Sequence, residues 1–282
     1  MKTNSTKFLK MNSMDVKSIE EIDDPEKLLT LTPLSYSRLD SYAQCHSRYF
    51  YTYVHLAPRS FAPHAVLGNV IHTSLENVLE KDVKVADIAD ALIEEYEIQK
   101  KEWDPDSLIP EDLLQSGEVM LNEFIDRHSH ESFAIEAKEM GFSIVIGTYL
   151  VSGYIDRVDI IGDTVYIFDY KSGRHEVSQK NVPDNLQLGL YAVAARAKFP
   201  GKKIHASLYY LKSGRIKGHL FTDEEMDAVE ARVIKTASEL IEDNTYQPTT
   251  NTRLCPWCDH AKSEICPTGV RARNAMPPSK RP

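Results

Sequence analysis

Two neighbouring segments with strand character constrain this chain more than any other feature. The first, Gly153–Arg157, carries Asp156, and the second, Val165–Lys171, carries Asp169 and Lys171. Both are rich in β-branched and aromatic residues, and the short polar loop between them is typical of a hairpin turn. Because residues two apart in a strand share a face, Asp169 and Lys171 point the same way. If Asp156 lies opposite them, two carboxylates and an amine converge on one point.

Two carboxylates held side by side need a compensating positive charge. Without a cation they repel, and one of them takes up a proton. A hard divalent cation with oxygen ligands resolves the repulsion, and Mg²⁺ or Mn²⁺ is the natural occupant. A lysine beside such an ion can hold a water molecule or stabilise charge that develops on a phosphate. The competing interpretation is that Asp169 and Lys171 form an ordinary surface pair.

Composition is that of a globular protein and limits the possible partners. The 282 residues suffice for one large domain or two small ones, with 42% hydrophobic and 27% charged residues. The formal net charge of −9 argues against a long nonspecific electrostatic grip on nucleic acid, but not against an enzyme whose basic residues gather at one groove. No apolar run reaches the length of a membrane span and no apolar signal core follows Met1–Ser5, so we expect a cytoplasmic protein without a membrane partner.

The order of the expected elements predicts an α/β sandwich around a mixed sheet. Helical patterns come first, three strands follow, and a helix, a hairpin and a long helix complete the order. Ser35 and Thr222 are expected N-caps, the second completed by Glu225 as a capping box. The expected helices are 35–53, 68–79, 85–101, 111–130, 184–198 and 223–243, and the expected strands are 142–150, 151–161, 164–171, 204–211 and 215–221.

Three further polar residues each have a structural and a functional interpretation. His72 lies one residue off the apolar stripe of its helix, so it is either a half-buried histidine or a third metal ligand. Gln187 and Tyr191 are four residues apart and share one helix face. Either Tyr191 is a core residue and Gln187 is solvated, or both project toward the groove of Asp169 and hold a phosphate or a base. Local physics leaves these alternatives open.

The order of the motifs along the chain resembles that of the PD-(D/E)xK nuclease superfamily. The motifs are Gly68 to His72, Gly153-x-x-Asp156, Asp169-x-Lys171 and Gln187-x-x-x-Tyr191. The resemblance is closest to the RecB-like branch, which includes the AddB nuclease module and the CRISPR-associated RecB-like exonucleases. It extends over residues 34–267, most of the chain. Each motif is weak alone, whereas their order is specific.

The resemblance implies a restriction-endonuclease-like fold. Its core is a mixed central sheet flanked by helices. The helical patterns before the strands add an N-terminal helical block, and the RecB-like branch implies a C-terminal iron–sulfur clasp. Composition, helical patterns and the resemblance together predict a flexible leader at 1–33, the helical region of the nuclease domain at 34–135, the catalytic core at 136–250, a cysteine segment at 251–270 and a flexible basic tail at 271–282.

The resemblance also implies a role for each motif residue. Lys171 would position and activate the attacking water, acting with Asp156 and Asp169 as the catalytic set. Glu136 is a weaker site candidate, at the place of a glutamate that often precedes the first core strand in this family. The expected metal ligands are His72, Asp156, Asp169 and the backbone carbonyl of Tyr170, and the expected DNA contacts are Gln187 and Tyr191.

The expected function is hydrolysis of DNA phosphodiester bonds by a metal-dependent nuclease, most simply an exonuclease on single-stranded ends in repair, recombination or CRISPR-type defence. The alternatives are a non-catalytic DNA-binding or assembly subunit that retains the fold, and a metal-binding protein whose cysteine site is the functional part. No phosphate-binding Gly-x-x-x-x-Gly-Lys loop is present, so a helicase or a recombination or CRISPR adaptation partner would have to open duplex DNA. Candidate DNA contacts are Arg38, Arg48, Arg157 and Arg174.

Cysteine spacing is the second strong pattern. The cysteines are Cys45, Cys255, Cys258 and Cys266. The three clustered thiols need a fourth ligand to complete a tetrahedral metal or iron–sulfur site, and disulfides are not expected in a cytosolic protein. The RecB-like resemblance implies that all four bind a 4Fe-4S cluster. Zinc is the less favoured alternative, with His46 or His260 able to replace one thiolate.

Overall fold

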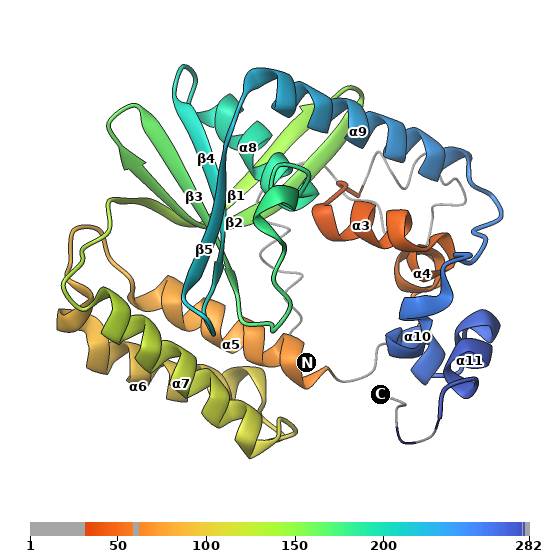
Figure 1. Cartoon of the computed structure of the whole chain (residues 1–282), viewed down its shortest axis with the longest axis horizontal. Helices are drawn as coiled ribbons and strands as arrows, with labels where there is room; N and C mark the ends of the chain where they lie inside the picture. The colour runs from red at the N-terminus through yellow and green to blue at the C-terminus, as the bar shows by residue number, and fades with distance from the viewer. Residues whose placement is uncertain (1–31, 59–61, 278, 280–282) are drawn as a thin grey trace, which may run out of the picture.

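A mixed five-stranded sheet forms the centre of the molecule (Figure 1). The computed structural model describes residues 32–58, 62–277 and 279, so the expected leader lies almost wholly outside the described residues. The strands, in spatial order, are β1 (Ile135–Ile146), β2 (Tyr149–Ile161), β3 (Thr164–Lys171), β4 (Lys203–Tyr210) and β5 (Arg215–Phe221). Strands β3 and β4 run parallel, and the other neighbours run antiparallel. The expected mixed sheet is confirmed.

Two groups of helices pack around the sheet, each with its own apolar cluster (Figure 1). The first group is α3 (Tyr36–Gln44), α8 (Leu186–Lys198) and α9 (Asp223–Glu242). The second group is α5 (Pro63–Val78), α6 (Ala89–Trp103) and α7 (Glu111–His128). Helix α8 is the crossover that a parallel β3–β4 pair requires, and nine of its thirteen residues are buried. Because helices cover the sheet, charged side chains on its strands are buried, among them Arg157, Asp159 and Asp169.

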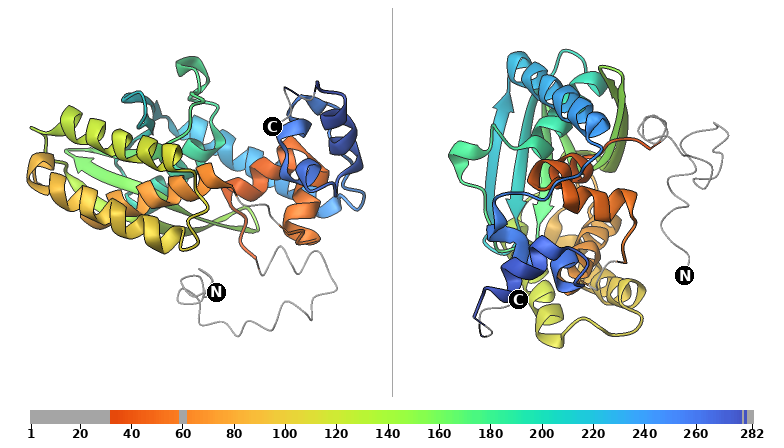
Figure 2. Two further views of the ribbon diagram at one scale, coloured as in Figure 1. Left: turned by 90° about the horizontal axis from the view of Figure 1, so that it is seen from below. Right: turned by 90° about the vertical axis from the view of Figure 1, so that its right-hand side faces the viewer.

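A third region lies at one end of the molecule, beside the first helices (Figures 1 and 2). It contains α4 (His46–Tyr49), a π-helical turn at Phe50–Val54, a 3₁₀ turn at Thr252–Trp257, α10 (Asp259–Lys262) and α11 (Pro267–Asn274). Thr52 Oγ1 lies 2.9 Å from Nε2 of His260, which joins the N-terminal and C-terminal parts of this region. The expected flexible tail begins too early, because Arg271 and Arg273 lie within α11.

The first two strands begin and end at different residues from those expected. Strand β1 starts seven residues earlier than the expected Phe142, and the turn to β2 lies after Ile146, not after Leu150. Gly147 has a φ of +61°, which closes a tight turn between the paired residues Ile146 and Tyr149. Residues typical of strands continue on both sides of Gly147, so the sequence pattern predicted the turn four residues too late.

The expected helix at 35–53 is broken at Cys45. The Ser35 side chain caps the first helix as expected, accepting from the backbone N–H of Arg38. Cys45 then adopts an extended conformation (φ −168°, ψ 117°), and the chain restarts as α4 and the π-helical turn. At the other end of the fold, the capping box of Thr222 and Glu225 is present as expected. Among the described residues, no helix combines the length and apolar character needed to cross a membrane.

Replacing Gly153 with alanine should destabilise the β1–β2 pair. Gly153 lies opposite Phe142, and an added Cβ would approach the Phe142 ring to 2.8 Å. Overpacking of this kind costs about 1–3 kcal/mol of folding free energy. Urea denaturation should therefore show a lower midpoint for Gly153→Ala. Gly173→Ala is the matched control, because its Cβ would meet no atom within 4 Å. Equal midpoints for the two variants would contradict the packing described.

Candidate active site

The ladder between β2 and β3 ends just before the two aspartates. The last recorded pair is Arg157 with Phe168, and Asp156 and Asp169 are the next residue on each strand. Beyond that point the backbone N–H of Tyr170 donates to the Asp156 carboxylate at 2.7 Å. A side chain therefore replaces the backbone partner at the position where the two carboxylates come close together.

Asp156 lies in a compact group of metal-ligating side chains. One ligand atom from each of His72, Glu139 and Asp156 lies within 4.8 Å of the others, the one such group among the described residues. His72 Nδ1 lies 3.4 Å from Asp156 Oδ2. These residues line a cavity of about 10 Å³, roughly the room of one water-sized species. A neutral imidazole and two carboxylates form a donor set that a divalent cation can use.

The electrostatics of this group favour a cation. Burial, and then the neighbouring Asp169 carboxylate, raise the pKa of Asp156 well above its ordinary value. Burial lowers the pKa of His72, so its ring is neutral near pH 7, the form that ligates metals. A positive ion at this position would reverse the repulsion that raises the pKa of Asp156.

Asp169 belongs to a closed ring of polar contacts. Its Oδ2 pairs with Lys171 Nζ at 2.6 Å, and Lys171 donates to Gln187 Oε1 at 2.9 Å. Gln187 Nε2 donates to the Tyr191 hydroxyl at 2.9 Å, and that hydroxyl donates to Asp169 Oδ1 at 3.3 Å. Asp169 and Tyr191 are buried. Helix α8 therefore acts on the lysine and the aspartate directly, because Gln187 and Tyr191 share one helix face.

The charges in this ring are well defined. Burial lowers the pKa of Lys171, but the Asp169 carboxylate outweighs it and the pKa is raised. Burial and Asp169 raise the pKa of Tyr191 well above its ordinary value, so its hydroxyl keeps the proton that it donates. The ring thus holds a protonated amine 2.6 Å from a carboxylate oxygen of Asp169.

The expected site residues fall into two adjoining sets. His72 and Asp156 lie together with Glu139, whereas Asp169 is not a member of that 4.8 Å group and instead contacts Lys171 and Tyr191. The two sets interact electrostatically, because the charges of Asp169 and Lys171 act on both Asp156 and His72. The order of the motifs predicted one cluster of site residues. The structure divides them into two adjoining sets.

Glu139 is the site residue that sequence reasoning missed. Its φ of +43° is unusual for a residue with a side chain. This irregular backbone position in β1 lies at the level of Asp156 in β2. The expected candidate was Glu136, which is exposed and pairs with Lys81 at 3.8 Å. Placing the hairpin turn at Gly147 and extending β1 backwards would have revealed Glu139. The register of that turn sets Lys138 opposite Arg157 and Met140 opposite Ile155, so Glu139 lies between them at the level of Asp156.

The arginines expected to contact DNA differ sharply in exposure. Arg48 and Arg174 are exposed, and Arg38 is half-buried and lies over the Tyr53 ring. Arg157 is 3% exposed, so the expectation that it contacts DNA is wrong. Strand alternation turns its side chain away from the face of Asp156.

The four cysteines lie around one place at the end of the molecule. Burial, then Cys45 and the two other C-terminal thiols, raise the pKa of Cys255. The Thr249 backbone N–H donates to Cys45 Sγ at 3.3 Å, and the Gly269 N–H donates to Cys266 Sγ at 3.5 Å. Among the described residues no three sulfurs lie within 4.8 Å of one another.

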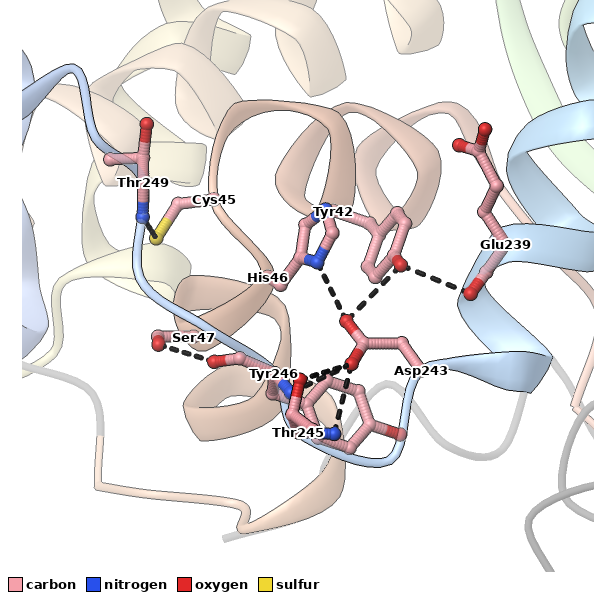
Figure 3. Close-up of polar contacts among 9 residues, drawn as sticks. All are labelled: Tyr42, Cys45, His46, Ser47, Glu239, Asp243, Thr245, Tyr246 and Thr249. Carbon is pink, nitrogen blue, oxygen red and sulfur yellow. Dashed lines mark hydrogen bonds and ion pairs between the residues drawn. The ribbon is translucent and has the colours of Figure 1, made fainter.

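A polar network around Asp243 connects the end of α9 to the break at Cys45 (Figure 3). Asp243 Oδ2 lies 2.6 Å from His46 Nδ1 and accepts from the Tyr42 hydroxyl at 3.2 Å. Asp243 Oδ1 accepts from the backbone N–H groups of Thr245 and Tyr246. This carboxylate therefore fixes the start of the C-terminal segment against α3 and α4.

Comparisons with known proteins give a family and a fold. The family model described as the PD-(D/E)XK nuclease superfamily matches residues 33–267. A solved structure described as a "putative exonuclease" from Eubacterium rectale is similar, with a TM-score of 0.54, 12% identity and 94% of each chain covered. A second, SSO0001, has a TM-score of 0.34 and 17% identity, covering 74% of this chain and 98% of that one. No curated protein matches the sequence. At these identities the first structure shows likeness of fold alone.

Asp243→Asn should destabilise the protein by about 1–3 kcal/mol at pH 7, because the amide nitrogen cannot accept from Tyr42 or His46. Burial raises the pKa of Asp243, but hydrogen bonds from Thr245 and Tyr246 outweigh it and lower the pKa from 3.8 to about 2. The stabilisation is therefore present above about pH 4 and is lost as pH falls toward 2. Urea unfolding should show the wild-type advantage shrinking over that range.

Asp227→Asn is the matched control, in the helix that ends just before Asp243. Asp227 is 69% exposed and pairs with Arg196 at the surface, so its loss should cost about 1 kcal/mol or less. If both variants unfold at the same urea concentration, the network around Asp243 does not hold the C-terminal segment.

Proposed function

Because the chain belongs to the PD-(D/E)XK nuclease superfamily, we propose that it is a divalent-metal-dependent deoxyribonuclease. The observation that carries the proposal is the meeting of Asp156, Asp169 and Lys171 where β2 and β3 separate. A buried carboxylate and a half-buried one beside a protonated amine have no evident use in stabilising the fold. It suits a phosphodiester, whose hydrolysis builds negative charge that cations can stabilise.

The cation would be held by the group around Asp156. His72, Glu139 and Asp156 supply the nitrogen and oxygen donors, with Asp169 and the Tyr170 carbonyl as the further ligands proposed from the motif order. Mg²⁺ or Mn²⁺ fits this donor chemistry. When bound, the ion would polarise a phosphoryl oxygen and lower the pKa of an attacking water.

Lys171 would hold the attacking water and stabilise the transition-state charge. The ring with Asp169, Gln187 and Tyr191 limits the directions in which its amine can point. Gln187 is half-buried beside this amine, so a contact with DNA from Gln187 would be made at the reacting phosphate.

The finer features of the proposal rest on the motif order. An exonuclease acting on single-stranded ends, the RecB-like branch, the boundaries given above with the tail starting after α11, and a cytoplasmic location are proposed on that basis. The similar structure from Eubacterium rectale is described as a "putative exonuclease", which agrees with the proposal. A helicase or a recombination or CRISPR adaptation partner would supply single strands. A non-catalytic assembly subunit is disfavoured, because such a subunit has no need of all three site residues.

The cysteines are proposed to bind a 4Fe-4S cluster that closes the nuclease domain. The proposal rests on the motif resemblance, on the proximity of Cys45 to the C-terminal thiols and on the backbone N–H groups directed at Cys45 and Cys266. The cluster would join the first helices to the C-terminal segment across about 200 residues of chain, which favours stabilisation. Its role would be structural.

Lys171→Ala should remove turnover and leave metal binding largely intact. Loss of the amine should lower the cleavage rate by about 100-fold or more, because it removes charge stabilisation at the reacting phosphate. Asp156→Ala should weaken both cleavage and metal binding. The measurements are degradation of single- and double-stranded DNA, labelled separately at each end, with Mg²⁺ or Mn²⁺, and calorimetric titration of the metal.

Lys203→Ala is the control, since Lys203 pairs with Asp163 at the surface far along the sheet from the site. Cleavage at the wild-type rate by Lys171→Ala would exclude the assigned role of this lysine. Equal cleavage by the wild type and Asp169→Ala would point to a contaminating nuclease and favour the assembly-subunit alternative.

Protein purified without oxygen should be brown, with broad visible absorption and iron equivalent to one cluster per chain. Cys258→Ser should lose the colour and unfold at a lower temperature, because a thiolate ligand is missing. It should keep the Mg²⁺ dependence of its residual cleavage if the cluster is structural. A colourless protein with stoichiometric zinc would overturn the cluster assignment.

A further inference from the structure

Arg157 is a buried charged residue that the proposed chemistry leaves without a role. It follows Asp156 directly in β2, so its side chain points to the opposite face of the strand. Both Arg157 and its neighbour Asp159 are almost fully buried, at 3% and 4% exposure. Burying an ion pair has a large desolvation cost, so its presence is weak evidence for stability and calls for another explanation.

The guanidinium of Arg157 is held on several sides. Its Nε lies 3.1 Å from Asp159 Oδ1, and its Nη1 donates to the Tyr170 hydroxyl at 2.9 Å. Its central carbon lies 4.1 Å from the Phe133 ring centroid and 4.2 Å from that of Phe168. Stacking between two rings combined with two polar partners leaves the group little freedom.

The bond from Arg157 to Tyr170 crosses between β2 and β3 where the backbone ladder has ended. The last ladder pair is Arg157 with Phe168, and the backbone N–H of Tyr170 is taken by the Asp156 carboxylate. Each residue of the Arg157–Tyr170 bond is next in sequence to one of the two aspartates, Asp156 or Asp169. The Arg157–Tyr170 bond therefore connects β2 and β3 on one face of the sheet. The repulsion between Asp156 and Asp169 acts on the opposite face.

We propose that Arg157, with Asp159 and Tyr170, forms a clamp that positions Asp156 and Asp169 to share one divalent cation. The inference rests on the proposed nuclease function and deepens it. Asp159 holds the guanidinium, the guanidinium holds the Tyr170 hydroxyl, and Tyr170 holds Asp156 through its backbone N–H. These are positioning residues, because none of their side chains needs to touch the cation or the DNA.

Tyr170→Phe is the sharpest test, because it removes only the hydroxyl that Arg157 contacts and keeps the ring and the backbone. Tyr209→Phe is a matched control. Tyr209 is paired with Tyr170 across β3 and β4, is 1% exposed, and gives its hydroxyl to a contact with His128 at 2.7 Å. Both substitutions therefore remove one buried hydroxyl from the same apolar cluster.

Three quantities should be measured for the wild type and both variants: the Mn²⁺ dissociation constant without DNA, the metal concentration for half-maximal cleavage, and KM for DNA. We expect Tyr170→Phe to weaken Mn²⁺ binding by about 10-fold or more, the usual effect of losing a partner of metal ligands. KM for DNA should stay unchanged, and saturating metal should restore much of the rate. Tyr209→Phe should match the wild type in all three quantities.

Equal metal binding by Tyr170→Phe and Tyr209→Phe would overturn the clamp, even if the wild type cleaves DNA normally. Conversely, a wild type that binds Mn²⁺ but cleaves no DNA would overturn the proposed function. The Mn²⁺ affinities of Tyr170→Phe and Tyr209→Phe would still show whether the clamp exists. A wild type that binds no Mn²⁺ would overturn both. Arg157→Lys is a second variant. A lysine amine lacks the planar guanidinium that contacts Asp159 and Tyr170 together, so this variant should lose at least as much Mn²⁺ affinity as Tyr170→Phe.

Discussion

The repulsion between Asp156 and Asp169 is the interaction around which this structure is organised. Two carboxylates come together where β2 and β3 lose their backbone pairing, and burial intensifies their mutual effect. The surrounding residues answer that repulsion in different ways. Lys171 neutralises Asp169, the N–H of Tyr170 bonds to Asp156, and His72 and Glu139 complete a donor set that a divalent cation can use.

The rest of the fold keeps these groups in place. Helix α8 is buried along most of its length, and it carries the amide and the hydroxyl that complete the ring around Lys171. On the other face, the guanidinium of Arg157 is stacked between two rings and bonded across the strands. At the far end, Asp243 fixes the C-terminal cysteine segment against the first helices (Figure 3). The site is therefore supported from the sheet and from both flanking layers.

Local sequence patterns were sufficient for features that depend on a few consecutive residues. Strand β3 spans the expected residues, and the capping of α3 by Ser35 and the capping box of α9 are present as expected. Patterns failed where a single residue changes direction. Gly147 turns the chain inside an uninterrupted strand pattern, and Cys45 breaks a helix whose apolar spacing continues past it.

The sequence by itself determined which strands carry Asp156, Asp169 and Lys171, and that Gln187 and Tyr191 share a helix face, because strand and helix periods follow from local geometry. Only the tertiary structure decided the partner of each group. It buried Arg157 away from solvent, set Glu139 rather than Glu136 beside Asp156, and joined Tyr191 to Asp169. Burial, register and hydrogen-bond partners depend on contacts between residues far apart in the chain, and no local pattern encodes them.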